Sequence, residues 1–132
     1  MNQENENTSL IKVSSGLLDA LSKGHFNIDV FKKEILVLEC QVAGTSFRKL
    51  EKVEAELLST VQLEMKREGK NEFDEFAIAL FFKEVKVGYI PRDKNEVIAR
   101  LMDAGKAFYA TIKAKEWEGN WLRLDVKVFM ND

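Results

Sequence analysis

The 132-residue sequence has little of several residue types that mark common classes of protein. It holds one cysteine (Cys40), one histidine (His25) and one proline (Pro91), too few for a disulfide framework or a site built from His and Cys ligands. The longest apolar run, which ends at Phe82, is too short to cross a bilayer. The 20 Lys and Arg residues are balanced by 22 Asp and Glu residues, which argues against a broad basic surface that coats duplex DNA.

The sequence also lacks the signatures of an enzyme. It contains no glycine-rich phosphate loop, no Cys-x-x-Cys pair and no nucleophile elbow. His25 has no neighbouring nucleophile or ligand set, and Cys40 lies in an apolar segment, where burial keeps a thiol unreactive. We therefore expect no catalytic residues, no metal site and no cofactor.

The first 33 residues differ in pattern from the rest. Residues 1–7 are polar and acidic and lack the basic and apolar parts of a secretion signal, so we expect a cytoplasmic protein without membrane attachment. Apolar residues then recur every three or four positions until Gly24, which predicts an amphipathic helix. They are Leu10, Ile11, Val13, Leu17, Leu18 and Leu21. We expect residues 1–33 to be a helical extension that packs on its own domain or binds a protein partner.

Residues 34–132 predict one mainly β (α+β) domain, because apolar residues there mostly alternate with polar ones. The expected strands cover residues 35–42, 61–67, 76–82 and 86–90, followed by a long hairpin of residues 107–117 and 121–129 that turns at 118–120. Strand 76–82 is apolar on both faces, so we expect it inside the sheet.

Two helices are expected among these strands. The first is a short helix over residues 51–58, with Val53 and Leu57 on one face. The second follows a capping box formed by Asp93 and Glu96 and ends at Gly105. Roughly six strands with a helix before the last hairpin indicate an OB-like bent sheet or partly open barrel.

Three segments, residues 42–48, 66–78 and 87–92, place aromatic, amide and charged side chains beside turns. The rings of Phe47 and Phe73 could stack on bases, and the amide and carboxylate groups could bind a sugar or a base edge. The local cations at these turns are Arg48, Lys66, Arg67, Lys70 and Arg92. The alternative is that the aromatic residues form the rim of the core and that Asp74 caps a turn.

In order and spacing, these segments resemble the HIRAN domain family, which occurs in eukaryotic DNA translocases that remodel stalled replication forks and in free-standing bacterial and phage proteins. The characteristic stretches read here as Val42–Arg48, Arg67–Ile78 and Val87–Arg92. The resemblance covers Leu36 to about Ala110 and leaves residues 1–33 and the last strand outside. The free-standing type is the one this sequence is similar to.

The resemblance implies a non-catalytic OB-like barrel that binds single-stranded DNA and captures its free 3′ end, in DNA repair or at replication forks. By position, Phe47 and Phe73 would stack on bases, and Asn71 and Asp74 would contact the last nucleotide, with Asp74 facing the 3′-hydroxyl. The remaining implied contacts are Arg92 to the phosphate backbone, Lys70 or Arg48 in support, and Tyr89 in the pocket wall.

Two positions depart from the family pattern. Gly69 replaces the usual proline, which loosens the loop that presents Asn71 and Phe73. Ser46 stands where eukaryotic binders carry an arginine. The alternative function is a protein-interaction module that uses the same groove or the N-terminal helix.

Overall fold

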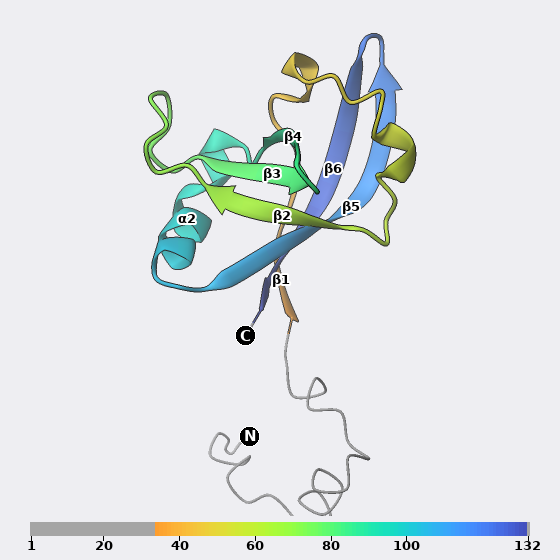
Figure 1. The fold of residues 1–132 in the computed structure, drawn as a ribbon. Helices are drawn as coiled ribbons and strands as arrows, with labels where there is room; N and C mark the ends of the chain where they lie inside the picture. The colour runs from red at the N-terminus through yellow and green to blue at the C-terminus, as the bar shows by residue number, and fades with distance from the viewer. Residues whose placement is uncertain (1–33, 132) are drawn as a thin grey trace, which may run out of the picture. The chain divides into compact units, whose positions relative to one another are not determined.

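A computed structural model of the protein describes residues 34–131, which form a strongly bent antiparallel sheet of six strands (Figure 1). The strands are β1 (Glu34–Gln41), β2 (Gln62–Arg67), β3 (Ile78–Phe82), β4 (Val85–Tyr89), β5 (Ala107–Glu118) and β6 (Trp121–Asn131). Their order across the sheet is β1-β6-β5-β2-β3-β4. This arrangement confirms the expected OB-like bent sheet, whereas the helix predicted within residues 1–33 lies outside the described residues.

The hairpin of β5 and β6 is the longest part of the sheet. The two strands pair from Ala107↔Asn131 to Glu118↔Trp121 and leave a two-residue turn at Gly119 and Asn120. Gly119 has a φ of 64°, which glycine adopts without steric cost. β6 also pairs with β1, while β5 pairs with β2, so the hairpin joins the two halves of the sheet.

One face of the sheet carries the hydrophobic core. Alternate residues of β6 are buried, as the two-residue period predicts. β3 is buried at most of its positions and lies between β2 and β4, which confirms its expected place inside the sheet. The largest fully buried side chains include Leu63, Ile78, Leu80, Leu124 and Val126.

The prediction of a helix over residues 51–58 is wrong. That segment contains only a 3₁₀ turn, η4 (Glu54–Glu56), and the Nζ of Lys115 donates to the backbone carbonyl of Glu54 and pairs with its carboxylate. Leu57 is fully buried and Val53 packs against the core. These two apolar residues therefore hold an irregular connection against the core and do not mark one face of a helix.

The second predicted helix exists as α2 (Glu96–Asp103), but its start differs from the expected capping box. Asp93 lies in a separate 3₁₀ turn, η5 (Arg92–Lys94), and Asn95 is the residue that precedes the helix. The C-terminal end is as predicted: Gly105 has a φ of 100°. Its N–H donates to Met102, and the N–H of Lys106 donates to Leu101, the hydrogen bonds of a Schellman motif. Among residues 34–131, no helix is long and apolar enough to span a membrane.

Candidate functional site

An open cleft lies between the loop of residues 68–77, the end of β4 with the turn after it, and the start of α2. We call residues 68–77 the cleft loop; Figure 1 shows it projecting from the end of β2. The cleft has a larger part of about 460 Å³ and a smaller part of about 280 Å³. Both parts are lined by Asn71, Phe73, Asp74 and Arg92, and Tyr89 lines the smaller one. The structure therefore brings together five of the eight residues singled out from the sequence.

Asn71 folds the cleft loop. Its Oδ1 accepts hydrogen bonds from the backbone N–H groups of Phe73 (2.8 Å) and Asp74 (3.1 Å), and its Nδ2 donates to Oε1 of Glu68 (3.0 Å). These bonds form an Asx turn and use both acceptor positions of the amide oxygen. One N–H of the Asn71 amide is left to contact a ligand, so this residue mainly shapes the site.

Asp74 is held in one orientation by two hydrogen bonds. Its Oδ1 accepts from the backbone N–H of Phe76 (2.9 Å), and its Oδ2 accepts from Nδ2 of Asn95 (2.7 Å). Asn95 is almost completely buried. Each carboxylate oxygen can accept a further hydrogen bond. Asp74 thus caps a turn and also presents a fixed acceptor to both parts of the cleft.

The two aromatic rings predicted to stack on bases project into solvent. Phe73 is 80% exposed at the cleft, and Phe47 is 86% exposed in the 3₁₀ turn η3 (Thr45–Phe47). The alternative that these rings form the rim of the core is therefore wrong. Phe47, Arg48 and Lys70 do not line either part of the cleft.

A small polar network supports the wall of the cleft at Tyr89. The Tyr89 hydroxyl donates to Oε1 of Glu68 (2.8 Å), and Nζ of Lys86 donates to Oε2 of Glu68 (2.7 Å) and to the Tyr89 oxygen (3.0 Å). Burial by itself raises the pKa of Glu68, but hydrogen bonds from Lys86, Asn71 and Tyr89 outweigh it and hold the pKa below its usual value. The sequence analysis missed the roles of Glu68 and Lys86, although Glu68 lies within the second motif segment.

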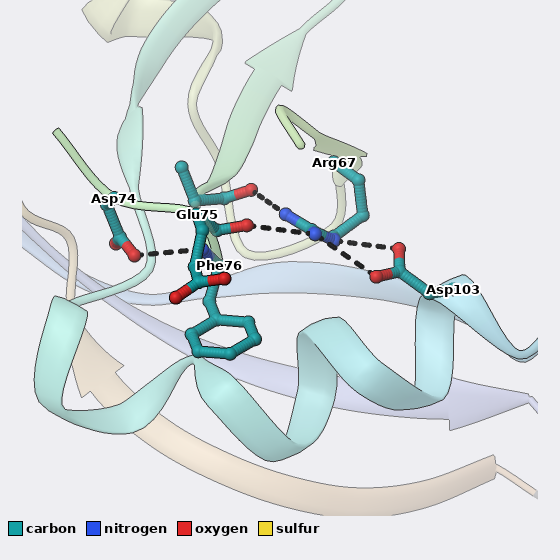
Figure 2. Close-up of polar contacts among 6 residues, drawn as sticks. Arg67, Asp74, Glu75, Phe76 and Asp103 are labelled. Atoms are coloured by element: carbon teal, nitrogen blue, oxygen red, sulfur yellow. Dashed lines mark hydrogen bonds and ion pairs between the residues drawn. The ribbon is translucent and has the colours of Figure 1, made fainter. Parts of the chain in front are cut away.

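Arg67 clamps the base of the cleft loop (Figure 2). Its Nη1 donates to the carbonyl of Ala77 (2.7 Å) and its Nη2 to that of Glu75 (3.1 Å), while Nε and Nη2 pair with the Asp103 carboxylate (2.9 and 3.1 Å). The guanidinium of Arg100 lies 5.0 Å from the centre of the Phe76 ring. The guanidinium of Arg67 therefore holds the loop and α2 together through its hydrogen bonds. This corrects the expectation that Arg67 is one of the cations available to bind a phosphate.

Replacing Arg67 by lysine is expected to lower the free energy of unfolding by about 2 kcal/mol, because one ammonium group cannot span acceptors on both the loop and α2. Urea denaturation measures this change. Arg100→Lys is the matched control, since lysine keeps a positive charge near the Phe76 ring and the ion pair of Arg100 with Glu96 is exposed and contributes little. Equal midpoints for wild type and Arg67→Lys would show that the clamp does not stabilise the fold.

Among residues 34–131, no three side chains of the types His, Cys, Asp and Glu converge in a way that could hold a metal ion.

Comparison with known proteins adds a family and two structures. The model of the HIRAN domain matches residues 35–131. A crystal structure of a protein from Lactobacillus plantarum superposes with a TM-score of 0.68 at 21% identity, covering 76% of this chain and 98% of that chain. The crystal structure of the HIRAN domain of human HLTF superposes with a TM-score of 0.57 at 15% identity, covering 74% of this chain and 78% of that chain. No curated protein matches the sequence.

These two likenesses concern the fold. The family match extends to residue 131, so the expectation that the last strand lies outside the resemblance is wrong. The reason is structural: β6 lies between β1 and β5 in the sheet, and its alternate residues are buried in the core.

Proposed function

The chain belongs to the HIRAN domain family, and from that premise we propose that it is a non-catalytic module that binds single-stranded DNA at the cleft and receives the free 3′ end. The observation that carries the proposal is that Asn71, Phe73, Asp74 and Arg92 line one open cleft. Free 3′ ends occur during DNA repair and at stalled replication forks, which is where such a module would act.

Phe73 supplies the stacking surface for the terminal base. A phenylalanine ring that is 80% exposed gains little from folding, whereas a base stacked on it stabilises a complex by about 1–3 kcal/mol. Phe47 offers a second exposed ring outside the lining of the cleft, where it would stack on a neighbouring base.

The charges of the cleft favour a hydroxyl over a phosphate. The larger part is lined by four carboxylates (Glu72, Asp74, Glu75 and Glu96) and one cation, Arg92. A terminal phosphate would be repelled there, whereas a 3′-hydroxyl can donate to the fixed Asp74 carboxylate.

The backbone phosphates would be bound at the border of the cleft. Arg92 has no ion-pair partner within the part of the chain that the structure describes, and Lys70 is exposed on the cleft loop, with Arg48 half-buried outside it. Few phosphate contacts predict modest affinity with a shallow dependence on salt.

A fluorescence titration with oligonucleotides ending in a 3′-hydroxyl or a 3′-phosphate tests the proposal. We expect the wild type to prefer the hydroxyl by about tenfold, the contribution of one hydrogen bond to a charged group. Asp74→Asn should abolish most of this preference, because the side chain keeps its size, loses its charge and replaces one of the two acceptor oxygens, which are both hydrogen-bonded in Asp74, by an NH₂ donor.

Asp93→Asn provides the matched control. Asp93 is exposed in η5, and its substitution removes the same charge outside the lining of the cleft. It should leave the preference unchanged. Equal wild-type binding of both oligonucleotides would exclude capture of the 3′ end, and no binding at low salt would exclude the function.

A further inference from the structure

Cations and aromatic rings alternate across β2, β3 and β4, starting at the cleft. The Nζ of Lys66 lies 4.7 Å from the centre of the Phe81 ring, and the Nζ of Lys86 lies 5.8 Å from Phe81 and 5.0 Å from the Tyr89 ring. The guanidinium carbon of Arg48 lies 5.9 Å from the Tyr89 ring. We call these five residues the outward ribbon.

Strand register places the four ribbon residues that lie in strands, Lys66, Phe81, Lys86 and Tyr89, on the face opposite the core. Lys66 pairs with Ala79, which pairs with Tyr89, and Phe81 pairs with Lys86. The residues between them in β3, such as Leu80, are buried in the core, so the ribbon side chains point away from it. The side chain of Lys66 is 51% exposed, and this face is open to solvent there.

The ribbon is continuous with the cleft through Tyr89. This residue lines the smaller part of the cleft and also contributes the ring that lies between Arg48 and Lys86. A strand whose terminal nucleotide occupies the cleft therefore finds rings and cations on the adjoining face of the sheet.

We propose that the outward ribbon is a second binding surface, which takes the nucleotides that precede the one held in the cleft. The proposal rests on the function proposed for the cleft. Phe81 and Tyr89 are half-buried; the part of each ring that solvent reaches can contact a base of any type, and the neighbouring cations can pair with the phosphates.

The charge of the ribbon favours stacking with few phosphate contacts. Lys86 pairs with Glu68 at 2.7 Å, so much of its charge is neutralised. The Nζ of Lys66 lies 3.9 Å from the carboxylate of Glu64. This ion pair is long and exposed to water, so it is weak. Lys66 is therefore the ribbon lysine whose charge is most available to a phosphate.

The test compares oligonucleotides of about three and about ten nucleotides with a free 3′-hydroxyl, because the longer one reaches beyond the cleft. The wild type should bind the longer one more tightly. Lys66→Gln should weaken binding of the longer oligonucleotide about fivefold and reduce its salt slope by about 0.7, the value for one phosphate contact of a single strand. Binding of the short oligonucleotide should not change.

Lys52→Gln is the matched control, because this exposed lysine precedes η4, which Figure 1 shows on the other side of the molecule from the cleft loop. Phe81→Leu gives a second variant that tests the ring, with its melting temperature measured alongside. The ribbon proposal is overturned if the longer oligonucleotide binds no more tightly, or if Lys66→Gln and Lys52→Gln behave alike. Absence of short-oligonucleotide binding to the wild type would instead overturn the cleft, and a remaining dependence on Lys66 would support the ribbon alone.

Discussion

Replacing Phe73 by alanine is expected to weaken binding of single-stranded DNA by at least about tenfold, within the range for loss of one stacked base. The ring is 80% exposed, and Phe73 takes part in the Asx turn at Asn71 only through its backbone N–H. Its removal therefore deletes ligand contacts without deleting core contacts, and the melting temperature should change by no more than a few degrees. Titration and thermal denaturation of the same preparation measure both quantities.

Val97→Ala is the control for this variant, because Val97 is an exposed apolar residue of α2 that does not line the cleft. It should leave DNA binding unchanged. Phe47→Ala should cause a smaller loss, since that ring lies outside the lining. Unfolding of Phe73→Ala would mean that the ring serves the fold, and full retention of DNA binding would remove Phe73 from the site.

The strands could be predicted because their signals are local. Alternation along β6 identifies which of its residues are buried, and Gly119 with Asn120 marks the turn of the hairpin. The capping box at Asp93 failed because the polar residue that precedes α2, Asn95, has its side chain turned to Asp74 and makes no cap bond. The helix expected over 51–58 failed because two apolar residues at helical spacing also anchor an irregular connection.

The cleft could be predicted only in part. Resemblance to a family indicated the residues that line it, including Phe73 and Asp74. The groups that hold them in place come from distant parts of the chain: Asn95 is 21 residues from Asp74, and Asp103 is 36 residues from Arg67. Neither composition nor spacing shows such a contact, because each depends on how α2 packs beside the cleft loop.

Gly88→Ala is expected to lower the free energy of unfolding by about 3 kcal/mol or more. A Cβ atom at this position would lie 2.5 Å from the carbonyl oxygen of Ala43 and 2.5 Å from Cγ1 of Val42. The φ of Gly88 is 156°, which adds backbone strain for any other residue. The backbone at Ala43 and the buried side chain of Val42 must both move to relieve these contacts. Such overpacking lowers stability more than a clash with a flexible side chain does.

The shift of the backbone caused by Gly88→Ala would also change the cleft. Ala43 and Tyr89 exchange two backbone hydrogen bonds of 2.8 and 2.9 Å beside Gly88, and both residues line the smaller part of the cleft. Any Gly88→Ala protein that folds should therefore bind DNA more weakly as well as melt roughly 12 °C lower. Gly69→Ala is the control, since its added Cβ would meet only the end of the Arg67 side chain at 3.7 Å. Similar melting temperatures for the two variants would show that close approach at Gly88 does not set the position of β4.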